Sequence, residues 1–247
     1  RIGRAFEREG VRMLSFKGPT LAQLAYGDLA RRQFTDLDIL IDQTDFHRAS
    51  SLLTSMGYRI GYGLSSDQQL YHVSRHSEAL FNGDVTDVDL HVRLLGERFR
   101  FALAFHELWE RRQNVSVAGG SSFDTISNDD LCLYLAVHGS KHCWQRVSWI
   151  RDMAFPLQPG RGIDWPALLD RARSDGCERI LLLGLSLARQ VCGCTLPDVV
   201  AAACDRDPSV QQLADDVEAH FPNPRRFIGT FERFRFSYRC RGRLGEA

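Results

Sequence analysis

Two segments rich in aspartate are the part of the sequence best suited to chemistry. Asp36 and Asp38 stand in Thr-Asp-Leu-Asp-Ile-Leu-Ile, residues 35–41. Side chains alternate between the two faces of a strand, so both carboxylates project to one side while Leu37 and the isoleucines face the core. Two adjacent negative charges repel each other unless a cation lies between them, and Mg²⁺ prefers carboxylate and phosphate oxygens. The pattern indicates a metal site, although an exposed edge strand without metal could carry the same pair.

A second segment, residues 85–93, repeats this alternation. Its polar face carries Asp87, Asp89, His91 and Arg93. If this strand pairs beside the first, Asp89 completes a three-carboxylate site, with Asp87 as the alternative third acid. Two ions about 3.5–4 Å apart would then hold the attacking and leaving oxygens of an in-line phosphoryl displacement.

The elements that must position these residues change character along the chain. Apolar periodicity predicts strands and helices in alternation up to about residue 118, and almost only helices beyond residue 127. The predicted strands are residues 13–16, 36–41, 71–73, 78–81 and 85–94, and the early helices are 19–26 and 46–56. The later helices are residues 127–141, 147–157, 164–174, 178–191 and 207–220. We therefore expect an α+β fold, with a small mixed β-sheet and flanking helices in residues 1–118, followed by an all-helical domain in residues 119–247.

Composition restricts the class of protein. The 247 residues contain 31 Lys and Arg against 31 Asp and Glu, so no global charge favours a nucleic-acid backbone or a membrane surface. No apolar run approaches the roughly 20 residues of a membrane-spanning helix. The seven cysteines form no paired CxxC motif, which is typical of reduced thiols. We expect a cytoplasmic protein without membrane contact; because the first residue is Arg, the natural N-terminus stays open.

The segment of residues 225–243 is rich in arginine and aromatic residues. It predicts a helix whose aromatic side chains pack on the helical domain. Because the overall charge is balanced, we expect no tight general binding of nucleic acid.

Further motifs follow one another in order along residues 14–155. They are Phe16-Lys17-Gly18, the strand with Asp36 and Asp38, Gly57-Tyr58, Asp89-Leu90-His91, and residues 138–144 with Trp149 and Asp152. Together they resemble the uncharacterised nucleotidyltransferase family of the DNA polymerase β superfamily. Two features differ from the usual pattern: the family commonly has Glu where Asp89 stands, and Gly18-Pro19 lies further from the aspartates than the superfamily's Gly-Ser.

The resemblance implies roles for individual residues. Asp36, Asp38 and Asp89 would bind two Mg²⁺ ions, with Mn²⁺ as an alternative, and the third of them would accept the proton of the acceptor hydroxyl. Lys17, Gly18 and Arg32 would bind the phosphates of a nucleoside triphosphate donor. Such an arrangement suits phosphoryl transfer, which depends on positioning and on stabilising the charge of the leaving pyrophosphate.

Several side chains are candidates for lining an acceptor cleft: His76, Glu78, His91, His138, His142 and Asp152. His138 and His142 are one helical turn apart, so they could instead form a structural polar cluster or bind a transition metal. His91 could equally be a core histidine. A small molecule, a modified peptide, a protein side chain and an RNA end all suit the acceptor.

The sequence thus favours an enzyme that moves a nucleoside monophosphate from a nucleoside triphosphate to a hydroxyl or phosphate acceptor. One alternative is a non-catalytic nucleotide-binding or interaction module on the same fold. Another is a metal-dependent phosphohydrolase that uses His138, His142, Asp152 and the strand aspartates.

Overall fold

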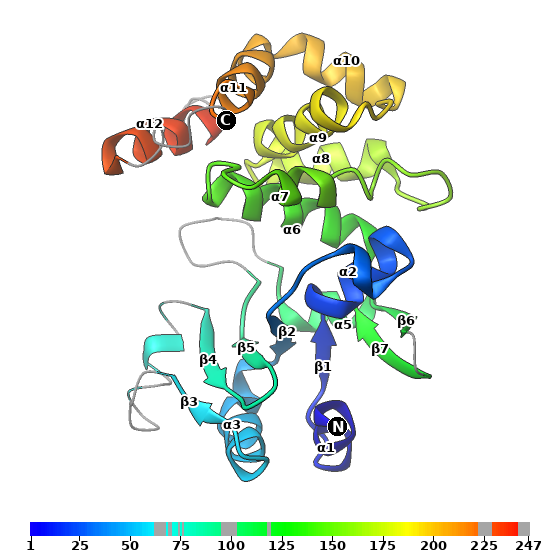
Figure 1. Ribbon diagram of the computed structural model, residues 1–247. Helices are drawn as coiled ribbons and strands as arrows, with labels where there is room; N and C mark the ends of the chain where they lie inside the picture. Colours follow the sequence, from blue (N-terminus) through cyan, green and yellow to red (C-terminus); the bar gives the residue numbers. More distant parts are fainter. Residues whose placement is uncertain are drawn as a thin grey trace. The chain divides into compact units, whose positions relative to one another are not determined.

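The computed structural model describes residues 1–61, 68, 71–73, 75, 77–94, 103–117, 120–221 and 229–241 (Figure 1). The chain divides into two units, Arg1–Ser127 and Asn128–Ala247. The sequence placed the boundary at residue 118, which lies outside the described residues. The observed division comes later because β6 (Gln113–Val117) and β7 (Ser121–Thr125) pair with each other, which keeps both strands in the first unit.

The first unit is built on a mixed five-stranded sheet in the order β1-β2-β5-β4-β3. The central pair, β2 and β5, is parallel, and the other neighbours are antiparallel. The strands are β1 (Met13–Ser15), β2 (Asp36–Ile41), β3 (Arg59–Ile60), β4 (Glu78–Asn82) and β5 (Asp87–His91). This mixed sheet with helices around it confirms the predicted α+β class.

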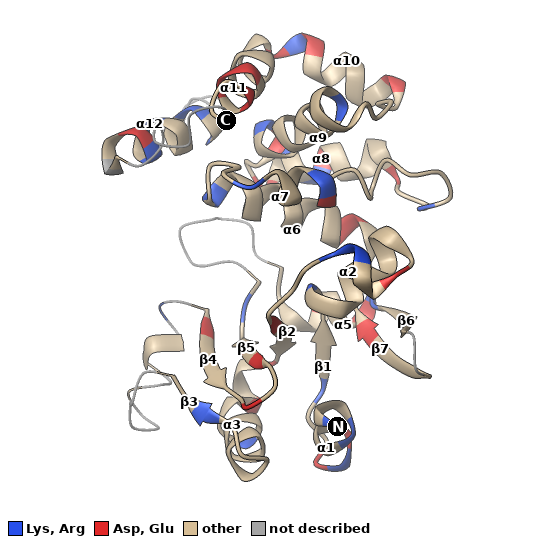
Figure 2. Ribbon diagram, in the orientation of Figure 1, with Lys and Arg blue, Asp and Glu red and all other residues tan. Residues whose placement is uncertain are grey.

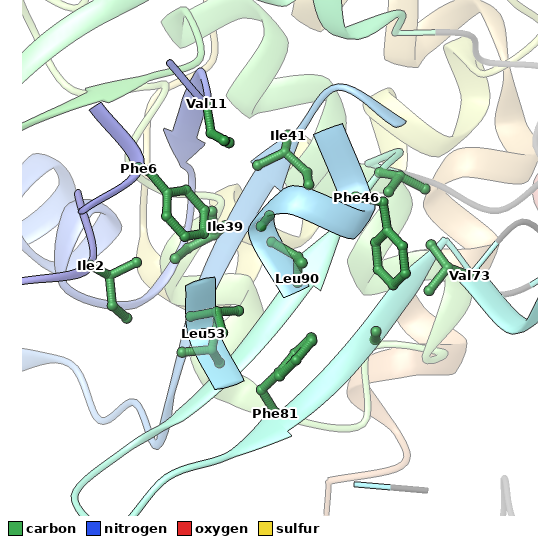
Figure 3. Packing of buried hydrophobic residues seen from close by; sticks show 14 residues of the cluster. Ile2, Phe6, Val11, Ile39, Ile41, Phe46, Leu53, Val73, Phe81 and Leu90 are labelled. Carbon is green, nitrogen blue, oxygen red and sulfur yellow. The ribbon is translucent and has the colours of Figure 1, made fainter. Parts of the chain in front are cut away.

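One face of this sheet packs against helices. The helices of the unit are α1 (Ile2–Arg8), α2 (Gly18–Tyr26), α3 (Phe46–Ser55) and α5 (Phe105–Glu110), with short 3₁₀ turns η1 (Leu29–Arg31) and η2 (Gln43–Asp45). Ile39 of β2 and Leu90 of β5 are buried in one cluster with Phe6 of α1 and Leu53 of α3 (Figure 3). Because side chains alternate along a strand, the aspartates of β2 and β5 face away from this cluster, as predicted.

Some predicted elements are wrong. Residues 71–73 were predicted as a strand from Tyr and Val, but they are helical. In a strand residues 71 and 73 would share one face, but Val73 is buried in the core cluster and Tyr71 is mostly exposed, an arrangement that a helix allows. The pairing of β3 with β4 and the β6–β7 hairpin were not predicted, because β3 has only two residues and most residues of β6 and β7 are polar.

The described residues of the second unit form helices and no strands. They are α6 (Asn128–Lys141), α7 (Val147–Asp152), α8 (Trp165–Ser174), α9 (Glu178–Cys192), α10 (Asp198–Arg206), α11 (Pro208–Glu218) and α12 (Thr230–Arg241). The Asp164 side chain accepts a hydrogen bond from the Ala167 N–H at 3.1 Å, which confirms the predicted N-cap of α8. The helix α7 ends earlier than predicted, and α10 was missed.

The helix α12 carries the predicted basic and aromatic segment. Phe236 and Cys240 are buried on it, and Arg239 pairs with Asp216 of α11. The prediction that the aromatic side chains pack is wrong for three of them, because Phe231, Phe234 and Tyr238 are exposed. One helix presents only one stripe to its neighbours, so side chains off that stripe stay in solvent.

Two further expectations bear on the whole chain. All seven cysteines are free, and most are buried, which agrees with reduced thiols in a helical core. Within the described ranges, no helix has both the length and the apolar character required to cross a bilayer.

Gly83, in the turn between β4 and β5, offers a test of this packing. A Cβ at this position would lie 2.4 Å from the carbonyl oxygen of Thr86 and 2.5 Å from a ring carbon of Tyr58. Since a backbone oxygen cannot yield without moving β5, we expect Gly83→Ala to lower the free energy of unfolding by about 2 kcal/mol. Urea denaturation followed by far-UV circular dichroism measures this.

Gly3→Ala is the matched control, because a Cβ there meets only the sulfur of Met13 at 3.9 Å. In a helix this exchange should be neutral or stabilise by about 0.5–1 kcal/mol. Equal stabilities of the two variants would contradict the account of the turn.

Candidate active site

The register of β2 and β5 brings the two aspartate pairs together. In this parallel pair Asp36 lies opposite Asp87, and Asp38 lies opposite Asp89. Figure 2 shows acidic residues on both strands. The pairing on which the predicted three-carboxylate site depended is therefore observed.

A compact group of metal-binding side chains results from this register. One ligand atom each from Asp38, Asp89 and His91 lies within 4.8 Å of the other two. Among the described residues, no other set of three or more His, Cys, Asp or Glu side chains meets that distance. Asp36 lies outside the group, but its charge acts on Asp89. The predicted acids therefore meet in part, and His91 joins them.

Asp87 and Asp89, the two candidates for the third acid, have different surroundings. The Asp87 carboxylate accepts a hydrogen bond from the Gly83 N–H at 3.1 Å, so it supports the turn before β5. Asp89 lies with Asp38 and His91 instead. The geometry favours Asp89 for the role that the sequence left open between them.

The predicted phosphate-binding residues surround the aspartates of β2. Lys17 places its Nζ 2.7 Å from Asp38 Oδ1. Gly18 has φ of 51°, and a Cβ there would lie 3.0 Å from the Asp36 carbonyl oxygen, so glycine is required where the chain passes β2. Arg32 follows η1, and its charge acts on Asp36. Local strand and turn structure therefore places all three beside the acids.

His91 connects the cluster to β4. Its Nε2 lies 3.3 Å from Asp38 Oδ1, and its Nδ1 lies 3.3 Å from Glu78 Oε2. The ring packs edge-on against Phe16, with centroids 5.1 Å apart. His91 is buried, whereas the Glu78 side chain is 45% exposed. A residue that contacts the acceptor must be accessible from solvent. Of the two predicted residues His91 and Glu78, only Glu78 meets this condition.

The other predicted acceptor residues lie in the second unit, apart from His76, which is outside the described residues. The rings of His138 and His142 are 4.9 Å apart, and both contact Trp149. Tyr134 stacks on His138. Asp152 is buried on α7. Within the described chain, His138, His142 and Asp152 do not by themselves form a metal-binding group of three.

Sequence reasoning missed the contribution of Tyr134 to this cluster. Tyr134, His138 and His142 follow one another at intervals of one helical turn on α6. Because such residues share one face of a helix, that spacing was the available signal.

Burial and crowded charge shift the pKa values of the three acids differently. Burial, and then the charge of Asp38, raises the pKa of Asp36. Burial also acts to raise the pKa of Asp38, but the positive charge of Lys17 and the neighbouring His91 hold it well below the usual range. Burial raises the pKa of Asp89 to about 6; His91 opposes this shift, and the charges of Asp38 and Asp36 add to it.

This electrostatic pattern fits a divalent cation. Lys17 lies against Asp38, whereas burial and the neighbouring carboxylates raise the pKa values of Asp36 and Asp89 despite the positive groups around them. Carboxylate oxygens at this spacing are the ligands that Mg²⁺ and Mn²⁺ take. The donor set therefore suits such an ion.

A separate cavity of about 670 Å³ lies in the same unit. Arg4, Arg12 and Trp109 are among its lining residues, together with Met13. Met13 pairs with Ile41, the last residue of β2, whereas Asp36 is the first residue of that strand. The cavity is therefore not part of the acidic site.

A mixed sheet with paired aspartates on adjacent central strands is the arrangement of a nucleotidyltransferase. The chain belongs to the uncharacterised nucleotidyltransferase family, whose sequence pattern matches residues 1–193. The match confirms the resemblance found in the motifs. A comparison with curated proteins gave no match.

Among solved structures, the chain is similar to the antibiotic-resistance factor ANT(2'')-Ia. The likeness covers 78% of this chain and 89% of that chain, with a TM-score of 0.42 and 13% sequence identity.

Asp89→Asn tests whether uncompensated charge destabilises the site. The folded-state pKa of Asp89, about 6, exceeds its ordinary value of 3.8, so folding favours the protonated acid. The parent should lose this contribution as pH rises from about 4 through about 6, and the variant should not. Two pKa units correspond to about 3 kcal/mol, and because Asp89 is partly solvated we expect the variant to be about 1 kcal/mol more stable at pH 8.

Urea unfolding in the presence of a chelator, between about pH 4 and pH 8, measures the difference. Asp84→Asn is the control, because Asp84 is 88% exposed in the turn and should change stability little at either pH. A metal-free Asp89→Asn variant that is less stable than the parent at pH 8 would contradict the electrostatic account.

Proposed function

We propose that the protein transfers a nucleoside monophosphate from a nucleoside triphosphate to a hydroxyl or phosphate acceptor, with a divalent metal held by Asp36, Asp38 and Asp89. The observation that carries this proposal is the parallel register that sets Asp38 beside Asp89 on the central strands. Membership of the nucleotidyltransferase family supports the class of reaction.

Mg²⁺ suits this donor set, and Mn²⁺ is the alternative. Asp36 and Asp38 would contact both of two ions, and Asp89 would hold one of them. When bound, the ions neutralise charge on the phosphates and bring the attacking and leaving oxygens into line.

The positively charged side chains have a role at the donor. Lys17 and Arg32 would bind triphosphate oxygens and offset the negative charge that develops on pyrophosphate. Gly18 opens α2, which has nine residues, so its backbone lies at the helix N-terminus, where phosphate is favoured. Lys17 contacts Asp38 at 2.7 Å, which places its ammonium group next to the proposed metal position.

In the reaction, an oxygen of the acceptor attacks the α-phosphorus of the nucleoside triphosphate. The new bond from this oxygen to phosphorus forms as the bond to the pyrophosphate oxygen breaks. The proton of the acceptor hydroxyl passes to the carboxylate of Asp89 and then to solvent, and pyrophosphate leaves.

The acceptor and the base of the nucleotide stay open. Glu78, which is 45% exposed and lies 3.3 Å from His91, is a candidate for contacting the acceptor. For His138, His142 and Asp152 a role at the acceptor stays a prediction.

Asp38→Asn is the direct test. The substitution keeps the shape of the side chain but removes a charge from the metal site, so transfer should fall at least about 100-fold. The assay supplies nucleoside triphosphates labelled at the α-phosphate, Mg²⁺ and a heat-treated cell extract as the source of acceptors. Parallel reactions with γ-label distinguish transfer from hydrolysis, because only nucleotidyl transfer leaves the α-label on the acceptor and releases the γ-label as pyrophosphate.

Asp87→Asn is the matched control on the same strand face. Because Asp87 bonds to the Gly83 N–H, its loss should affect stability and leave transfer within a few-fold of the parent. Transfer by Asp38→Asn at the parental rate would refute the mechanism. Release of γ-label as inorganic phosphate, without α-label on any product, would support a phosphohydrolase instead.

A further inference from the structure

The buried imidazole of His91 lies between two carboxylates that belong to different strands. Glu78 stands directly opposite His91 in the antiparallel β4–β5 pair. Asp38, on β2, reaches the same ring from the other side. Directly opposed residues of adjacent strands share one face, and Asp38 is opposite Asp89, two residues before His91, so all three side chains lie on the same face.

Within the described part of the chain, neither ring nitrogen of His91 has a hydrogen bond of good geometry. Both are buried, and neither has a partner of suitable geometry among the described residues, although each lies 3.3 Å from a carboxylate oxygen. Leaving a buried polar atom without a hydrogen bond costs about 1–3 kcal/mol. Such an atom beside a carboxylate is explained if a third group, a cation, takes the lone pair of the nitrogen.

The distances fit shared coordination. Ligand atoms about 2.1 Å from one ion lie roughly 3.0–3.4 Å apart at octahedral or tetrahedral angles. His91 Nε2 and Asp38 Oδ1 are 3.3 Å apart, and a ligand atom of Asp89 lies within 4.8 Å of the other two residues. Small adjustments of Asp89 would complete the site.

Glu78 stands where a carboxylate orients a metal-binding histidine. A histidine that binds metal through one nitrogen usually donates the N–H of the other to a carboxylate, which fixes the tautomer. With Nδ1–H directed at Glu78 Oε2, the Nε2 lone pair points toward Asp38. The edge-on contact with Phe16 restrains the ring in this orientation.

We propose that His91 is a direct metal ligand, through Nε2, at a site that it shares with Asp38 and Asp89, and that Glu78 positions it. An imidazole ligand favours first-row transition metals over Mg²⁺, which takes oxygen ligands. One metal position of this protein therefore selects Mn²⁺ over Mg²⁺. The inference deepens the metal site of the proposed function, but it concerns binding alone and is tested without nucleotide.

The experiment is pulsed electron paramagnetic resonance of the full chain loaded with one equivalent of Mn²⁺. Direct ligation by imidazole predicts modulation from a directly bound ¹⁴N in the parent, and its replacement by the ¹⁵N pattern after labelling of histidine. His91→Gln should abolish the modulation and weaken Mn²⁺ binding, measured by calorimetry, at least about 10-fold, with less than about 3-fold change for Mg²⁺. Glu78→Gln should keep the modulation and weaken Mn²⁺ binding about 10-fold.

His106→Gln is the control, because it removes an exposed imidazole of α5 and should change neither signal nor affinity. If His91→Gln does not fold, His91→Asn is the second variant, because it also removes the imidazole and should abolish the modulation. Absence of nitrogen modulation in the parent, or its persistence in folded His91→Gln, would overturn the proposal. Nitrogen modulation without nucleotidyl transfer would support the ligand and refute only the proposed function.

Discussion

The site depends on the parallel pairing of β2 with β5, which forces acidic side chains of like charge onto one small area. Asp38 lies opposite Asp89, and both are removed from much of the solvent that would screen them. Repulsion of this kind is unfavourable unless positive charge is added. Lys17 supplies part of that charge by its contact with Asp38, while burial and the charges of Asp38 and Asp36 still raise the pKa of Asp89.

The opposite face of the same strands maintains this unfavourable arrangement. Ile39 and Leu90 are buried in a cluster with residues of α1 and α3. A slip of one residue in the pairing would turn apolar side chains to solvent and the aspartates into the core, at a cost in hydrophobic burial and in desolvation of the carboxylates. Hydrophobic packing on one face of the sheet thus stabilises the register that keeps the repelling carboxylates close together on the other face.

Period-two alternation was sufficient to predict which residues of β2 and β5 share a face, because that pattern is local. The bounds of β2 agree with the prediction. The partners of His91 were less accessible, because its contact with Asp38 depends on the β2–β5 register and its contact with Glu78 on the β4–β5 register. The Lys17 contact likewise requires β1 to lie beside β2. The helix at residues 71–73 was predicted as a strand, because the burial of Val73 depends on tertiary packing that the local sequence does not show.

The central claim is that the face of β2 and β5 bearing Asp38 and Asp89 binds a divalent cation. The most direct measurement is anomalous diffraction from crystals of the full chain soaked in Mn²⁺ with a non-hydrolysable nucleoside triphosphate. The account predicts an anomalous peak within about 2.5 Å of carboxylate oxygens of both Asp38 and Asp89, and its loss in Asp38→Asn. An ordered nucleotide with no peak at these carboxylates, or a peak at His138 and His142 alone, would contradict it.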